Sequence, residues 1–187
     1  TKLLILIKAN SYGHGAVEFA RQMEKAGADY FGIAHPIEGV ELRQGGIKIP
    51  ILVLTAGTDS FEEIVDHNLE PSLPTIEAVR KFDDYLKSRN IGSYPAHIKL
   101  DTGMHRLGFM KDELPELIEY LKDKPRIKVQ SIFSHLAASD DPQHDEFTRG
   151  QWEMYKKHSS MIDAVLDYKP IHHILNSAGI ERFSEYQ

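Results

Sequence analysis

Short apolar segments alternate with longer amphipathic ones along the whole chain, and this alternation restricts the fold more than any other feature. The apolar segments have the length of strands and recur at about 20 to 35 residues, with helical patterns between them. Strands that repeat in this way are parallel and are joined by crossover helices, so the sequence predicts an α/β sheet covered by helices. The predicted strands are Leu3 to Ala9, Tyr30 to Ala34, Ile51 to Thr55, Glu70 to Leu73, His97 to Leu100, Ser131 to Ser134 and His173 to Asn176.

Four of the intervening segments carry apolar residues at helical spacing, and we interpret these stripes as core packing. In one of them Leu114, Leu117, Ile118 and Leu121 fall at i, i+3, i+4 and i+7. The other three stripes are Ala16, Phe19, Ala20 and Met23, with Gly27 placed to end the helix; Ile76, Val79, Phe82 and Leu86; and His158, Met161, Ile162 and Val165.

A parallel α/β chain can form an open doubly wound sheet or close into a (β/α)8 barrel. No Gly-x-Gly-x-x-Gly follows the first strand, which disfavours the dinucleotide-binding fold. A complete barrel has about eight strands and about 250 residues. With seven predicted strands in 187 residues, we expect one barrel domain over 1–187, truncated at both ends, without its last strand and the helix before its first strand.

Composition excludes several classes of function. The net charge is −6 and the basic residues are dispersed, so nucleic acid is not an expected partner. No apolar run reaches the roughly 18 to 20 residues that a membrane span needs. The chain has no cysteine, which excludes disulfides and thiolate metal sites and fits the cytoplasm. Histidines such as His14 and His35 have no acidic partner at a regular ligand spacing, so we expect no metal.

The first predicted strand delivers Lys8, and Ala9-Asn10-Ser11-Tyr12-Gly13-His14-Gly15 follows at once. Burial disfavours the charged ammonium and so lowers the pKa of a lysine, which makes its amine nucleophilic. Such an amine forms a Schiff base with an aldehyde substrate or with pyridoxal 5'-phosphate. The Tyr12 hydroxyl is a candidate phosphate ligand. On the residues alone, Lys8 can also extend into solvent from the end of the strand.

In a barrel the active site lies at the carboxyl ends of the strands. The fifth predicted strand leads into Lys99-Leu100-Asp101-Thr102-Gly103-Met104-His105-Arg106-Leu107-Gly108, and the sixth into Ser134-His135-Leu136-Ala137. The seventh ends at Asn176-Ser177, where a helix N-terminus and a hydroxyl favour a phosphate.

These blocks resemble the motifs of the alanine racemases, a family of fold-type III enzymes that use pyridoxal 5'-phosphate. The segment from Ile7 to Gly15 is similar to the family's cofactor-attachment motif, with Ser11 where alanine or glycine is usual. The segment from Lys99 to Gly108 is similar to the family's Lys-x-Asp-Thr-Gly-Met-x-Arg-x-Gly pattern. The resemblance covers the whole chain in four ordered blocks and selects the barrel.

The resemblance implies a role for each matching residue. Lys8 carries the cofactor as an internal aldimine and serves as one of two catalytic bases, and Arg106 contacts the cofactor and binds the substrate carboxylate. Lys99 is a candidate for carbamylation that would orient Arg106, although pairing with Asp101 is an alternative. Tyr12, His135, Asn176 and Ser177 complete the implied cofactor-binding set, although His135 on an apolar strand also fits a hydrogen-bonded core residue.

The resulting expectation is racemisation of alanine for peptidoglycan synthesis by a cytoplasmic homodimer acting on a small amino acid. The second base is expected from a β-rich domain outside this chain, so the chain alone should be nearly inactive. Three alternatives remain from the sequence. They are a single-domain barrel that binds the cofactor without racemase activity, a fold-type III amino-acid decarboxylase and a Schiff-base aldolase.

Overall fold

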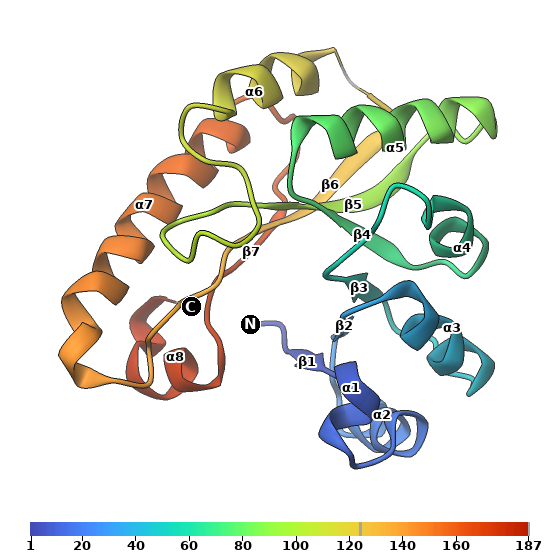
Figure 1. Cartoon of the computed structure of the whole chain (residues 1–187), viewed down its shortest axis with the longest axis horizontal. Coiled ribbons are helices and arrows are strands. Elements are labelled where there is room, and N and C mark those ends of the chain that lie inside the picture. Colours follow the sequence, from blue (N-terminus) through green and yellow to red (C-terminus); the bar gives the residue numbers. More distant parts are fainter. Residues whose placement is uncertain (124, 187) are drawn as a thin grey trace. The chain divides into compact units, whose positions relative to one another are not determined.

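The computed structural model describes residues 1–123 and 125–186 (Figure 1). Packing divides the chain into two compact units, Thr1–Ser72 and Leu73–Gln187, which are described separately below.

The first unit is a parallel β/α array in which the strands pair in chain order. Leu4 pairs with Tyr30 in the first pair of strands, and Phe31 pairs with Ile51 in the second. The elements are β1 (Leu4–Leu6), α1 (Lys8–Tyr12), α2 (Ala16–Lys25), β2 (Tyr30–Ile33), α3 (Pro36–Gln44), β3 (Ile51–Val53), α4 (Phe61–Asp66) and β4 (Glu70–Leu73). Strands β2 and β3 are buried along their whole length, as expected for apolar runs in a parallel sheet.

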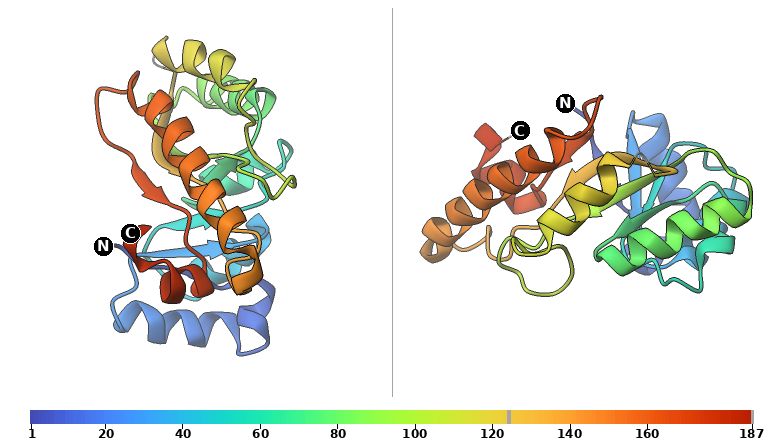
Figure 2. Two further views of the ribbon diagram at one scale, coloured as in Figure 1. Left: turned by 90° about the vertical axis from the view of Figure 1, so that its left-hand side faces the viewer. Right: turned by 90° about the horizontal axis from the view of Figure 1, so that it is seen from above.

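The second unit repeats the pattern with longer elements. Its strands β5, β6 and β7 are parallel and pair in chain order. The elements are α5 (Ile76–Ser88), β5 (Tyr94–Lys99), α6 (Leu114–Lys122), β6 (Ile127–Phe133), η1 (Pro142–His144), α7 (Asp145–Asp163), β7 (Ile171–His173), α8 (Ser177–Arg182) and η2 (Ser184–Tyr186). Helices α6 and α7 lie side by side (Figure 2).

The predicted alternation of parallel strands and helices is confirmed, and the apolar stripes lie where helices pack. Val79, Phe82 and Leu86 are fully buried on α5, and Leu114 and Leu117 are fully buried on α6. The stripe that begins at His158 was predicted to continue to Val165, which is wrong because α7 ends at Asp163.

Two predicted strands have different bounds in the structure. Strand β1 ends at Leu6 and not at Ala9, because a helical turn begins at Lys8 and the backbone becomes left-handed from Ala9. Strand β7 covers Ile171–His173 and shares only His173 with the predicted 173–176. The chain must leave the sheet there because Asn176 caps the next helix.

Candidate active site

Lys8 lies at the start of a left-handed helical turn, not within a strand. The four residues after it, Ala9, Asn10, Ser11 and Tyr12, all have φ between 53° and 54°. Residues with a Cβ atom avoid this conformation, at a cost of roughly 1 to 2 kcal/mol each. Consecutive strained residues persist only where their surroundings hold them, and they cluster at functional sites. The prediction that Lys8 ends a buried strand was therefore wrong in its local geometry.

Hydrogen bonds within the segment stabilise this turn. Ser11 N donates to Ile7 O at 2.9 Å, and the amides of Gly13 and Gly15 each donate to Asn10 O at 3.1 Å. The Asn10 side-chain oxygen accepts from Ala16 N, the first residue of α2, at 2.7 Å. Asparagine suits this position because it tolerates the left-handed region and bonds its own neighbourhood.

The turn brings Lys8 and Tyr12 together. The Lys8 ammonium lies 6.0 Å from the centroid of the Tyr12 ring, and the Lys8 residue is half-buried. Tyr12 is 61% exposed, so its hydroxyl is accessible to a ligand. A Cβ atom on Gly13 or Gly15 would meet no atom within 4 Å, so open space adjoins this backbone. This arrangement of Lys8, Tyr12 and open space fits the prediction that the cofactor is attached at Lys8.

In the second unit, Lys99 ends β5 and is only 7% exposed. Its ammonium lies 5.8 Å from the centroid of the Phe133 ring. Burial lowers the pKa of Lys99, the positive charge of Arg106 lowers it further, and Asp101 opposes the shift. The charges of Lys99 and Arg106 thus disfavour each other, whereas Asp101 favours the charged form of Lys99.

Asp101 organises the loop that carries Arg106. Its Oδ1 accepts hydrogen bonds from Gly103 N at 2.9 Å and from His105 N at 3.0 Å. The loop returns to the end of β5, where Phe109 N donates to Lys99 O at 2.8 Å. Arg106 itself is exposed, so its guanidinium is available to an anion.

The segment after β6 is tied to the neighbouring elements by hydroxyl and amide groups. Ser134 Oγ lies 2.7 Å from Thr102 Oγ1 and donates to Leu100 O at 2.8 Å. From α7, Gln151 Nε2 donates to His135 O at 3.1 Å. The His135 residue is half-buried.

Asn176 caps α8 and thereby places Ser177 at the first position of that helix. Asn176 Oδ1 accepts from Gly179 N at 2.9 Å and from Ser139 Oγ at 2.7 Å. Asn176 Nδ2 donates to Leu136 O at 3.2 Å. The Asn176 side chain thus makes three bonds within the protein, and Ser177 is the member of the predicted pair with a hydroxyl at the helix start.

Sequence reasoning missed a buried polar chain across β5, β6 and β7. His97 Nδ1 lies 2.6 Å from Ser131 Oγ, which lies 3.2 Å from His173 Nε2. A register shift after Ala96 places His97 opposite Ser131. Burial lowers the pKa of His173 to about 3, and the neighbouring His97 and His172 contribute in the same direction. No local pattern in the sequence indicates this chain of hydrogen bonds, because it depends on the register shift.

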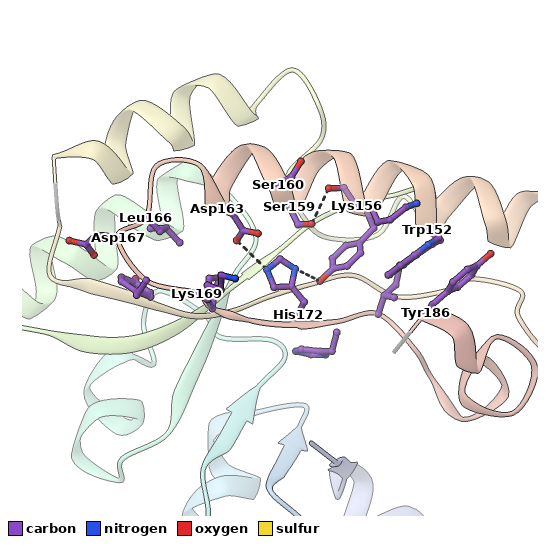
Figure 3. Close-up of a pocket in the computed structure, with 15 residues that line it drawn as sticks. Trp152, Lys156, Ser159, Ser160, Asp163, Leu166, Asp167, Lys169, His172 and Tyr186 are labelled. Carbon is purple, nitrogen blue, oxygen red and sulfur yellow. Dashed lines mark hydrogen bonds and ion pairs between the residues drawn. The ribbon is translucent and has the colours of Figure 1, made fainter. Parts of the chain in front are cut away.

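A cavity of about 760 Å³ lies beside α7 and β7, lined by Trp152, Tyr155 and Lys156 among others (Figure 3). His172 connects its walls, because Nε2 lies 3.1 Å from Asp163 Oδ1 and Nδ1 lies 3.3 Å from the Tyr155 hydroxyl. None of the predicted site residues lines this cavity.

Over residues 1–123 and 125–186, no three His, Asp or Glu side chains are placed to share a metal ion. No helix in these ranges has the length and apolar character required to cross a bilayer.

The two units together define a class of protein. It is a parallel β/α protein whose polar and ionisable side chains follow the carboxyl ends of its strands, with a lysine on a left-handed turn after the first strand.

Comparison with known proteins identifies the family. The family model "Alanine racemase, N-terminal domain" matches residues 1–187. An alanine racemase of Synechocystis sp. is 40% identical over 182 residues, covering 95% of this chain and 48% of the relative. The chain belongs to the alanine racemase family and corresponds to its N-terminal domain. It spans about half the length of the curated relatives that it matches.

Solved structures agree with this assignment. An alanine racemase from Clostridium difficile 630 matches with a TM-score of 0.88 and 36% identity, over 96% of this chain and 47% of that one. The enzyme from Streptomyces lavendulae matches with a TM-score of 0.91 and 26% identity, over 100% of this chain and 49% of that one. The predicted (β/α) barrel class is thereby confirmed.

Proposed function

We propose that the protein containing this chain interconverts L- and D-alanine with pyridoxal 5'-phosphate attached to Lys8. The observation that carries the proposal is the lysine on a strained left-handed turn, with the accessible Tyr12 ring 6.0 Å from its ammonium. A related alanine racemase from Bartonella henselae, 26% identical over 100% of this chain and 53% of its own, is described with covalently bound pyridoxal phosphate.

Pyridoxal 5'-phosphate, when bound, withdraws electrons from the Cα of an attached amino acid and so acidifies its hydrogen. Lys8 would hold the cofactor through its amine. The same amine, when not attached to the cofactor, would exchange a proton at the substrate Cα on one face. Tyr12 and Ser177 would donate hydroxyl hydrogen bonds to the phosphate, and Asn176 would keep Ser177 at the start of α8. His135 would also contact the cofactor.

Arg106 would bind the substrate carboxylate, because an exposed guanidinium offers paired donors to two oxygens. The loop bonds of Asp101 would fix where that guanidinium is presented. Carbamylation of Lys99 would convert the repulsion between the two cations into a charge-assisted hydrogen bond. Carbon-13 NMR under labelled bicarbonate tests the modification, and an unmodified amine in the cofactor-loaded protein would contradict it.

The second base would come from chain outside these 187 residues, in a homodimer. The proposed physiological role is the supply of D-alanine for peptidoglycan in the cytoplasm. Membership of the alanine racemase family supports both the external second base and this physiological role.

The activity test uses a polypeptide of the relatives' length that includes this chain. We expect conversion of L-alanine to D-alanine that requires added pyridoxal 5'-phosphate and is abolished by Lys8→Ala. Release of carbon dioxide from a basic amino acid, or cofactor binding without either reaction, would support one of the alternative functions instead. Arg106→Lys is the matched variant for the carboxylate contact, since it keeps the charge and loses the paired donors.

A further inference from the structure

The strained turn at Lys8 is held from outside its own segment by one carboxylate. Glu38 lies in the first turn of α3, and its Oε1 accepts a hydrogen bond from Ala9 N at 2.7 Å. Ala9 immediately follows Lys8 in the sequence and is the first residue of the left-handed turn with positive φ. The bond therefore connects α3 to the peptide unit that leaves Lys8.

The other oxygen of the same carboxylate anchors Glu38 to the end of β2. Oε2 accepts from Ala34 N at 2.7 Å and from His35 N at 3.1 Å. The bond to His35 is half of an ordinary capping box, which needs only a glutamate or glutamine at this helical position. The bond to Ala9 spans 29 residues and has no part in capping α3. Two local bonds and one distant bond thus share a single side chain.

The chemistry of the three bonds favours a carboxylate over its neutral analogue. An ionised carboxylate is an acceptor at both oxygens, so it satisfies amides on two sides at once. A glutamine has one accepting oxygen and one donating nitrogen, so it would leave either Ala9 N or the Ala34 and His35 amides facing a donor. Hydrogen bonds to a charged acceptor are also stronger than neutral ones.

We infer that Glu38 is a positioning residue for Lys8, whose carboxylate fixes the left-handed turn and so sets where the Lys8 amine is presented. The inference rests on the proposed function, because it assigns Glu38 to the same cofactor-bearing lysine. Glu38 itself does not touch the cofactor in this account. Its effect passes through the backbone of Ala9.

The first unit offers a matched control. Glu24 Oε1 accepts from Lys48 N and Ile49 N, each at 3.1 Å, so it also joins a helix to a distant backbone segment. That segment precedes β3 and contains no site residue. Glu24 and Glu38 are both half-buried. Both bonds of Glu24 end on one oxygen, which a glutamine also offers, so Glu24→Gln controls for the loss of a half-buried negative charge without the loss of a hydrogen bond.

The first measurement is hydrogen exchange of the 8–15 segment in the 187-residue chain without cofactor. Loss of a bond to a charged acceptor should raise the exchange rate of this segment about tenfold in Glu38→Gln, whereas Glu24→Gln should leave it unchanged. Glu38→Asp keeps the charge near Ala34 and His35 but is one methylene shorter, so it should also expose Ala9. Equal exchange in all four proteins would overturn the inference. If Glu38→Gln fails to fold, Glu38→Asp decides the matter by the same comparison.

The second measurement is the rate at which borohydride traps a pyridoxyl group on Lys8 after addition of pyridoxal 5'-phosphate. We expect labelling of Lys8 to be about tenfold slower in Glu38→Gln and Glu38→Asp than in the wild type and Glu24→Gln. Wild-type rates in the Glu38 variants would contradict the positioning role. Failure of the wild type to label at Lys8 would instead contradict the proposed function, and the exchange experiment would still decide whether Glu38 holds the turn.

Discussion

A Cβ atom on Gly108 would lie 2.6 Å from the amide nitrogen of Asp101, closer than real Cβ contacts come. Gly108 also has φ of +129°, a region that side chains rarely adopt. The two residues lie at opposite ends of the loop that carries Arg106. Only glycine lets this loop close against its own beginning at the end of β5.

Gly108→Ala should therefore lower the free energy of unfolding by about 2 to 4 kcal/mol, because the added methyl meets backbone that cannot move aside. Urea denaturation of the chain measures this change. Gly92→Ala is the control, since a Cβ at Gly92 would meet nothing within 4 Å, and it should change the free energy of unfolding by less than about 0.5 kcal/mol. Equal effects of the two substitutions would contradict this account of the loop.

The buried Lys99 should give the protein a specific dependence on alkaline pH. Its pKa is lowered in the folded state, chiefly by burial. The unfolded chain then binds more protons than the folded one just below the ordinary lysine pKa, so stability rises with pH in that interval. Lys99→Met removes the cost of burying the charged ammonium, so it should raise the free energy of unfolding at pH 7 in bicarbonate-free buffer. Urea denaturation of the wild type and Lys99→Met at pH 7 and pH 10 tests this pH dependence. A Lys99→Met variant less stable than the wild type at pH 7 would contradict it.

His173 should contribute a loss of stability in acid. Its folded-state pKa is about 3 and the ordinary value is 6.5, so only the unfolded chain takes up its proton between these values. The contribution of neutral His173 to the free energy of unfolding is complete above pH 6.5. It decreases as the pH falls, by up to about 1.4 kcal/mol per pH unit. His173→Gln should flatten this decline in urea denaturation series from pH 7 to pH 4. Parallel curves for His173→Gln and the wild type would refute the assignment.

Tyr12→Phe and Ser177→Ala should each weaken binding of pyridoxal 5'-phosphate. Each removes one hydrogen bond to a charged group, worth roughly 1.5 to 3 kcal/mol, which corresponds to about a tenfold to hundredfold increase in Kd. Titration followed by the absorbance of the bound cofactor measures this effect. Tyr168→Phe is a control, because its hydroxyl accepts a hydrogen bond from Val129 N in the sheet. Unchanged affinity in both site variants would place the phosphate elsewhere.

Periodicity predicted most of the fold because the buried elements are uniformly apolar. Strands β2 and β3 consist of YFGI and ILV, and the helix stripes repeat at regular spacing. The end of β1 was not predictable in this way, since the apolar run continues through Ile7 while the backbone changes hand at Ala9. The displaced β7 has a similar cause, because Ile174 is buried although it lies outside the strand.

Sequence motifs indicated the residues of the candidate site. The motifs did not indicate the side chains that hold those residues in place. Glu38 and Gln151 are polar residues in helical segments, and nothing in the local sequence shows that their side chains reach backbone 14 to 29 residues away. The histidine chain depends on a register shift between β5 and β6, which no local pattern encodes. Bonds between distant segments become visible only when the fold is known.

The most direct test of the central claim is the site of covalent cofactor attachment. The chain is incubated with pyridoxal 5'-phosphate, reduced with borohydride, digested and mapped by mass spectrometry, alongside Lys8→Arg and the exposed control Lys25→Arg. We expect a pyridoxyl group on Lys8 in the wild type and in Lys25→Arg, and its loss in Lys8→Arg. Labelling concentrated on another lysine, or unchanged in Lys8→Arg, would contradict it.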